Sequence, residues 1–174
     1  MITILRLGHR ASRDHRISTH LGLVARSFDA DKIIYSGERD GKLISSIKDV
    51  VKRWGGPFEV KFKKNWRKFL MNFDGKVVHL TMYGLSLQEK INEIRNDTKN
   101  NDLLIVVGGK KVPPEIYKTA DYNIAVTNQP HSEVAALGVF LHELKQGEEL
   151  EKEFENYQVK IKPEKNGKNV VEKD

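Results

Sequence analysis

Residues 103 to 141 read LLIVVGGKKVPPEIYKTADYNIAVTNQPHSEVAALGVFL and contain the pattern that decides the fold. Two short apolar runs, Leu103 to Val107 and Tyr122 to Val126, are typical of buried strands. Each run leads into a loop of unusual composition. In an open α/β sheet, ligands bind at the carboxyl ends of the strands, where both loops would lie. The stretch therefore predicts a ligand site built from two strand ends.

The two loops differ in chemistry. Residues 108 to 114 (GGKKVPP) begin with two glycines, which let the backbone approach a bound group closely, and end in two prolines that make the exit rigid. Residues 127 to 133 (TNQPHSE) lead into a nearly all-apolar helix through capping residues and a first-turn proline, Pro130. The exposed N–H groups at the start of that helix are suited to a polar ligand.

Strand and helix patterns alternate along the rest of the chain, which indicates an α/β fold with a mostly parallel sheet and helices on both faces. Further strands are expected at Ile2 to Leu7, Lys32 to Tyr35, Phe58 to Lys63 and Lys76 to Thr81. The alternating apolar and charged residues of Phe58 to Lys63 indicate an edge strand. Helices are expected near Ser18 to Phe28 and over Asp40 to Trp54, 65 to 73 and Ser86 to Thr98.

The carboxyl-terminal part of the sequence differs in kind from the rest. We expect a domain over residues 1–147 and an extension over residues 148–174. Asn166 and Gly167 lie between two runs of alternating residues, which predicts a β-hairpin. A lone hairpin is marginal in water, so it would pack on the domain or on a second subunit. The alternative is a frayed, charged tail.

The amino-acid composition excludes several classes of protein and of functional site. A chain of 174 residues without cysteine holds no disulfide, thiolate zinc site or cysteine nucleophile. No apolar run approaches the roughly 20 residues needed to span a bilayer, and the start resembles no signal peptide, so we expect a cytoplasmic protein. Residues 1–70 contain 16 Lys or Arg and 7 Asp or Glu, whereas residues 71–174 contain 14 Lys or Arg and 17 Asp or Glu. The basic half is either a polyanion-binding surface or a solvated face.

The densest polar stretch, Arg6 to His20 (RLGHRASRDHRISTH), follows the first expected strand. Arginine suits bidentate contact with phosphate, so this stretch indicates contact with nucleic-acid backbone. The RNA-binding candidates are Arg6, His9, Arg10, Arg13 and His20. The histidine spacings match no compact metal-ligand pair, so no metal is expected. The sequence also lacks a nucleophile elbow, a Walker phosphate loop and a dinucleotide-binding fingerprint.

Four motifs in series resemble one known family. They are Arg6 to His20, Leu80 to Gly84 (LTMYG), Val107 to Pro113 (VGGKKVP) and Asn128 to Ala136 (NQPHSEVAA). Together they resemble the archaeal tRNA (cytidine-56) 2′-O-methyltransferases of the SPOUT class, from about residue 2 to residue 145. The carboxyl-terminal hairpin resembles an extra element of that family.

The resemblance implies an S-adenosyl-L-methionine enzyme with a carboxyl-terminal trefoil knot, acting as a homodimer on the T-loop of tRNA. General fold rules by themselves argue against a knot. By similarity, three loops would hold the cofactor, and apolar side chains such as Leu80, Val112 and Val126 would sandwich its base. The implied cofactor-binding residues are Leu80, Thr81, Met82, Tyr83, Gly84, Gly108, Gly109, Lys110, Lys111, Val112, Val126, Thr127, Asn128, Gln129, Pro130, His131, Ser132, Val134 and Ala135.

The implied reaction requires a ribose hydroxyl to attack a sulfonium methyl group, so the protein contributes mainly positioning and help with deprotonation. By resemblance, related enzymes use an arginine whose position falls near Leu23 when the chains are registered through residues 28 to 31. We therefore expect another arginine, Arg16, with Arg13 and Arg10 as alternatives, to align a phosphate or the hydroxyl. His131 and Ser132 are further candidates for accepting the proton or orienting the hydroxyl, although either residue could instead cap a helix. The competing functions are a non-catalytic RNA-binding module and methylation of a different RNA nucleotide.

Overall fold

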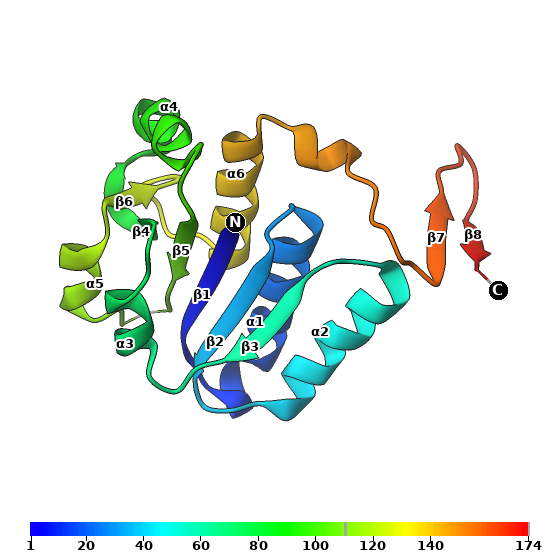
Figure 1. Ribbon diagram of the computed structural model, residues 1–174, viewed down its shortest axis with the longest axis horizontal. Helices are drawn as coiled ribbons and strands as arrows, with labels where there is room; N and C mark the ends of the chain where they lie inside the picture. The colour runs from blue at the N-terminus through cyan, green and yellow to red at the C-terminus, as the bar shows by residue number, and fades with distance from the viewer. Residues whose placement is uncertain (110, 174) are drawn as a thin grey trace.

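The computed structural model describes residues 1–109 and 111–173. Six parallel strands form one sheet in the order β3-β2-β1-β5-β4-β6 (Figure 1). This confirms the α/β class and the parallel sheet expected from the sequence. The strands are β1 (Ile2–His9), β2 (Lys32–Gly37), β3 (Glu59–Phe62), β4 (Lys76–Ser86), β5 (Leu103–Val107) and β6 (Tyr122–Ala125). β3 is at one edge, as its alternating pattern predicted, and β6 is at the other.

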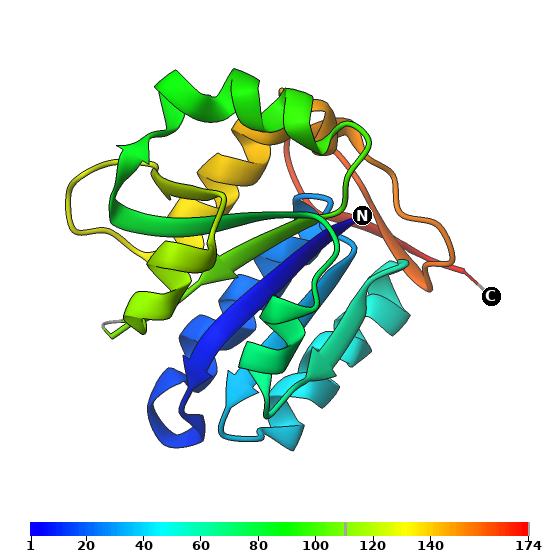
Figure 2. The same ribbon diagram turned by 60° about the vertical axis from the view of Figure 1, so that its left-hand side comes forward.

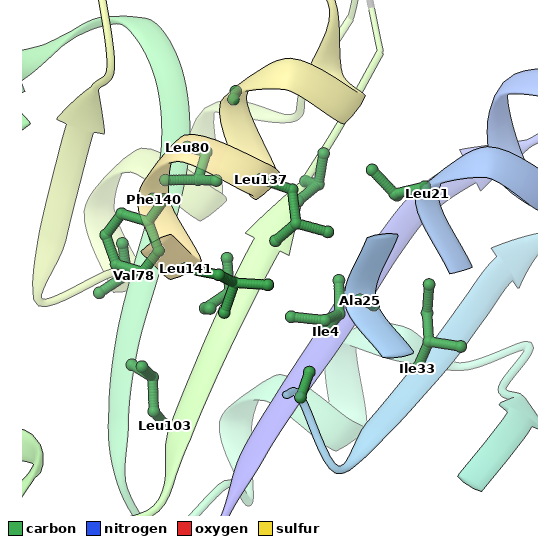
Figure 3. Packing of buried hydrophobic residues seen from close by; sticks show 14 of the residues in the cluster. Ile4, Leu21, Ala25, Ile33, Val78, Leu80, Leu103, Leu137, Phe140 and Leu141 are labelled. Carbon is green, nitrogen blue, oxygen red and sulfur yellow. The ribbon is translucent and has the colours of Figure 1, made fainter. Parts of the chain in front are cut away.

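Helices cover both faces of the sheet, because the central strands are apolar on both sides. On one face, buried residues of α1 (Ala11–Ser27), α2 (Gly41–Trp54), α4 (Leu87–Thr98) and α6 (Glu133–Lys145) pack on the sheet. Leu137, Phe140 and Leu141 of α6 belong to this core together with Val78 and Leu80 of β4, and Phe140 lies beside these two β4 residues (Figure 3). On the other face, a smaller core lies under α3 (Trp66–Met71) and α5 (Pro114–Thr119).

The connections after β1 and β5 leave the sheet toward opposite faces. β1 continues into α1, which belongs to the larger core, whereas β5 continues into α5, which belongs to the smaller one. The two strands are hydrogen-bonded neighbours, and Arg6 is in register with Val107 near their carboxyl ends. Such a topological switch point opens a crevice outside the strand ends, and ligands bind there in α/β proteins.

Two local predictions were wrong, and one helix was not predicted. α1 begins at Ala11 and not near Ser18, because Asp14 in its first turn accepts a hydrogen bond from the Arg10 backbone (N···O 3.1 Å), and arginine is a good helix former. Pro130 lies outside the helix that follows it, since Ser132 is the N-cap of α6. Helix α5 was not expected, although Pro114 occupies the first helical position, where proline is favoured.

The carboxyl-terminal residues form the predicted hairpin. After the short 3₁₀ helix η1 (Glu148–Glu151), strands β7 (Val159–Lys162) and β8 (Asn169–Glu172) pair antiparallel (Figure 1). The segment before the hairpin contacts the end of α2. Gln158 donates its backbone N–H to the Arg53 carbonyl at 2.9 Å. The frayed-tail alternative is therefore wrong for the described part of this extension.

Candidate active site

A cavity of about 520 Å³ lies at the carboxyl ends of β4, β5 and β6. The end of β4 forms one wall. Leu80 and Leu85 are both in register with Ile124 of β6, so residues 81 to 84 bulge out of the sheet. The loop after β6, yellow-green in Figure 2, lies beside this bulge. Asn128 ties the two together, because its Nδ2 donates to the carbonyls of Met82 (2.7 Å) and Gly84 (3.2 Å).

Gly84 is required by this close approach of β4 and β6. A Cβ added at Gly84 would lie 2.5 Å from the carbonyl carbon and oxygen of Asn123, closer than real Cβ atoms come. Any side chain at this position would push the bulge away from β6. Gly84 itself does not line the cavity but keeps the wall formed by Leu80 to Tyr83 in place.

The structure brings together residues from all three segments expected to hold a cofactor. Those that line the cavity are Leu80, Thr81, Met82, Tyr83, Gly108, Gly109, Val112, Val126, Pro130 and His131. Other expected residues belong to the same segments without lining the cavity, namely Gly84, Lys111, Thr127, Asn128, Gln129, Ser132, Val134 and Ala135. Lys110 lies outside the described residues. A mostly apolar concave site of this volume suits a nucleoside-sized ligand.

Sequence reasoning missed six lining residues: His79, Val107, Tyr117, Ile124, Glu133 and Ala136. His79 is buried, and its Nδ1 lies 2.9 Å from Asn123 Oδ1. Because Asn123 Nδ2 donates to the Tyr117 carbonyl at 2.8 Å, its Oδ1 is an acceptor and His79 Nδ1 carries the proton. Burial lowers the pKa of His79, which keeps the ring neutral. The sequence feature that could have identified His79 as a site residue is its position as a lone histidine within the apolar run VVHLT.

Three neighbouring residues at the start of α6 carry polar groups. His131 Nδ1 donates to the Gln129 carbonyl at 2.6 Å, so the unprotonated Nε2 of the neutral ring is an acceptor. Ser132 caps α6, since its Oγ accepts from the Val134 backbone N–H at 3.2 Å. Glu133, the first residue of α6, supplies a carboxylate to the cavity wall. The capping role weighed for Ser132 is thus present in the structure.

The arginines of the first motif occupy different environments. Arg10 pairs with Asp14 through Nη2 and Oδ1 at 2.8 Å, and this hydrogen-bonded pair lowers the pKa of Asp14 to about 2 despite partial burial. Arg13 and Arg16 are exposed on α1, as is His20, and none of them lines the cavity. His9 faces the interior, where its Nδ1 lies 2.9 Å from Ser18 Oγ.

Arg6 is the buried arginine of this motif, with 3% of its surface exposed. Its Nη2 lies 3.8 Å from Glu133 Oε1. Among the residues that the structure describes, no group of three or more histidine, aspartate or glutamate side chains is arranged to hold a metal ion. Within the same residues, no helix is both long and apolar enough to cross a membrane.

The arrangement of strands and helices is that of the SpoU and TrmH methyltransferases. The SpoU methyltransferase AviRb from Streptomyces viridochromogenes, solved with AdoMet, matches with a TM-score of 0.55 at 10% identity, over 84% of this chain and 57% of that chain. The TrmH/SpoU tRNA modifying enzyme of A. aeolicus matches with a TM-score of 0.55 at 18% identity, over 86% of this chain and 75% of that chain. At these identities the likeness defines the fold class.

Sequence comparison identifies the family. Residues 54–171 match the family model described as tRNA ribose 2′-O-methyltransferase, aTrm56, and the chain belongs to this family. It is 54% identical to the tRNA (cytidine(56)-2′-O)-methyltransferase of Pyrococcus horikoshii over 99% of this chain and 85% of that protein. The protein of the same name from Methanocaldococcus jannaschii is 51% identical, over 98% of this chain and 96% of that protein.

Proposed function

We propose that this protein transfers the methyl group of S-adenosyl-L-methionine to the 2′-hydroxyl of cytidine 56 in the T-loop of tRNA. The observation that carries the proposal is the cavity at the carboxyl ends of β4, β5 and β6, in a chain of the tRNA ribose 2′-O-methyltransferase family. The shared name of the two relatives, at 54% and 51% identity, supports the choice of nucleotide.

The cavity fits the proposed cofactor in size and in lining. Leu80, Val112 and Val126 supply apolar side chains for the faces of a purine, and residues 81 to 83 and 108 to 109 add backbone polar groups. When bound, the cofactor supplies an electrophilic methyl group on a sulfonium, which leaves as a neutral thioether. The chain's own task is to hold this group in line with a ribose oxygen and to keep both in place.

Deprotonation of the ribose hydroxyl requires an acceptor near the cavity. His131 Nε2 is suited to this role, because the Nδ1 proton is held by the Gln129 carbonyl. Ser132 Oγ already accepts from the Val134 backbone N–H, and its hydroxyl proton, which has no acceptor among the described residues, would be donated toward the ribose and orient it.

The exposed arginines of α1 are proposed to hold RNA. Arg16, or Arg13 in its place, would align a phosphate rather than remove a proton, because a guanidinium stays protonated at any relevant pH. Arg10 is the weaker alternative, since Asp14 already holds it in an ion pair. His20 is exposed on the same helix, whereas His9 would have to leave the interior to contact RNA.

The same proposal includes a homodimer and a cytoplasmic location. Arg13 and Arg16 do not line the cavity of their own chain, so a second copy whose cavity faces α1 would bring these residues to a reaction centre. The trefoil knot and the division into residues 1–147 and 148–174 stay predictions. Sedimentation of the full chain tests the dimer, and a monomer at micromolar concentration would contradict it.

The decisive experiment is methyl transfer from labelled S-adenosyl-L-methionine to unmodified tRNA, followed by mapping of the labelled fragment. The expected product carries one methyl on the ribose of cytidine 56. Label on another nucleotide would support an RNA methyltransferase but would contradict cytidine 56 as its target. Calorimetric titration with the cofactor separates an enzyme from an RNA-binding module, because the module would bind tRNA with strong salt dependence and show no cofactor binding.

A further inference from the structure

Arg6 is a buried cation with incomplete hydrogen bonding. The side chain is 3% exposed, and its Nη1 has no hydrogen-bond partner among the described residues. The nearest carboxylate oxygen, Glu133 Oε1, lies 3.8 Å from Nη2, which is longer than a charge-assisted hydrogen bond of about 2.7–2.9 Å. A buried charge without full compensation is costly, so its presence at this position needs a reason.

The position of Arg6 supplies that reason. Arg6 is near the carboxyl end of β1, in register with Val107 of β5, at the point where the two strands continue to opposite faces of the sheet. Val107 and Glu133 both line the cavity. The guanidinium therefore lies directly behind the cavity wall, at the switch point where α/β proteins bind ligands.

Gly109 leaves space next to the guanidinium. A Cβ placed on Gly109 would lie 3.8 Å from Arg6 Nη1, Arg6 Nη2 and Glu133 Oε1, and in the described part of the chain no other heavy atom is closer to that point, apart from those of the chain neighbours of Gly109. Gly109 also lines the cavity. A larger residue would fill the space between the cavity and the guanidinium, whereas glycine keeps it open.

We infer that Arg6 binds an oxyanion at this edge of the cavity and thereby positions the reacting groups. The inference rests on the proposed function, and two sources carry the required chemistry: the carboxylate of the cofactor's methionine part and a phosphate next to the target ribose. Either oxyanion would accept hydrogen bonds from the planar guanidinium fork, whose Nη1 has no partner among the described residues. Arg6 then acts inside the site, unlike the exposed Arg13 and Arg16.

The test compares Arg6→Met, which keeps an unbranched apolar stem and removes the guanidinium charge, with Gly109→Val, which leaves Arg6 intact and fills the space beside it. Calorimetry measures the Kd of S-adenosyl-L-methionine and of 5′-methylthioadenosine, which lacks the amino-acid part. Steady-state kinetics measure kcat and KM for unmodified tRNA. Thermal unfolding of each variant reports whether the fold is retained.

Each source of the oxyanion predicts a different result. If Arg6 holds the cofactor carboxylate, Arg6→Met raises the Kd of S-adenosyl-L-methionine about 10- to 100-fold and leaves that of 5′-methylthioadenosine unchanged, and Gly109→Val raises the first Kd by a larger factor than the second. If Arg6 holds an RNA phosphate, Arg6→Met retains the cofactor Kd while kcat/KM for tRNA falls by about the same factor.

The inference is overturned if folded Gly109→Val protein keeps both the cofactor Kd and the tRNA kinetics within about threefold of wild type, well short of that factor. Gly109→Val decides the matter even if Arg6→Met fails to fold. A wild-type protein that neither binds the cofactor nor methylates tRNA would instead refute the proposed function, so the two failures are distinguishable.

Discussion

At the scale of single residues, Asp40 joins three parts of the fold behind the first motif. Its Oδ1 accepts from the Leu43 backbone N–H at 3.0 Å and caps α2, while its Oδ2 lies 2.8 Å from His15 Nδ1 and 3.4 Å from His9 Nε2. Burial raises the pKa of Asp40, but the hydrogen bonds from His15 and Leu43 outweigh it and lower the pKa from 3.8 to about 2. One carboxylate therefore connects β1, α1 and α2.

The substitution Asp40→Asn should destabilise the protein by about 2 kcal/mol at neutral pH. Because the folded-state pKa of Asp40 is depressed, its contribution is fully present above about pH 4 and is lost as the pH falls toward 2. Denaturant unfolding at several pH values should show the two proteins converging in acid. Asp49→Asn, an exposed position on α2, is the control, and an equal loss in both variants would refute the role of Asp40.

At the scale of elements, the cavity depends on how β4 leaves the sheet. The strand pairs with β6 on both sides of the bulge at residues 81 to 84, and Asn128 holds the bulge to the following loop. We therefore predict that cofactor binding and strand pairing are coupled. A change that shifts the bulge should alter the cavity even when the substituted residue does not line it.

Gly84→Ala tests this coupling. The added Cβ cannot be accommodated against Asn123 without moving the bulge, so we expect a stability loss of about 1–3 kcal/mol and a cofactor Kd raised at least about tenfold. Gly41→Ala is the matched control, because a Cβ at Gly41 meets no heavy atom of the described residues within 4 Å, apart from its chain neighbours and its own helix backbone. Unfolding and calorimetry measure the two effects. Normal cofactor binding by Gly84→Ala would contradict the coupling.

At the scale of the whole molecule, the carboxyl-terminal extension completes the interior around Arg26. Arg26 is 8% exposed, its Nη2 donates to the Trp54 and Gly55 carbonyls at 2.8 and 2.7 Å, and its guanidinium lies 4.2 Å from the centre of the Phe154 ring. Burial lowers the pKa of Arg26. Phe154 therefore covers a cation that links α1 to the end of α2.

Phe154→Ala should open this site to water and lower the free energy of unfolding by about 1–2 kcal/mol, which corresponds to a Tm decrease of roughly 2–8 °C for a chain of this size. Leu150→Ala, at a position 65% exposed, should leave the Tm unchanged and serves as the control. Sedimentation of both variants shows whether the extension also supports the proposed dimer. An unaltered Tm for Phe154→Ala would mean that the extension contributes nothing to the stability of the domain.

The sequence by itself determined the class of fold, because hydrophobic periodicity depends only on which residues must be buried. The runs at Leu103 to Val107 and Tyr122 to Val126, the edge strand near Glu59 to Phe62 and the hairpin around Asn166 and Gly167 all follow from local composition. The same apolar runs predict a ligand site at the carboxyl ends of these strands, which is where the cavity lies. The resemblance carried by the four motifs pointed to the family.

Only the tertiary structure decided which polar residues meet. Strand order is set by long-range packing, so no local pattern shows that β1 lies beside β5 and brings Arg6 close to Glu133. Burial separates Arg6 from Arg13 and Arg16, although all three belong to one basic stretch. The sequence did not predict His79 and Tyr117 in the cavity wall either, because their neighbours there come from strands and helices distant in the chain.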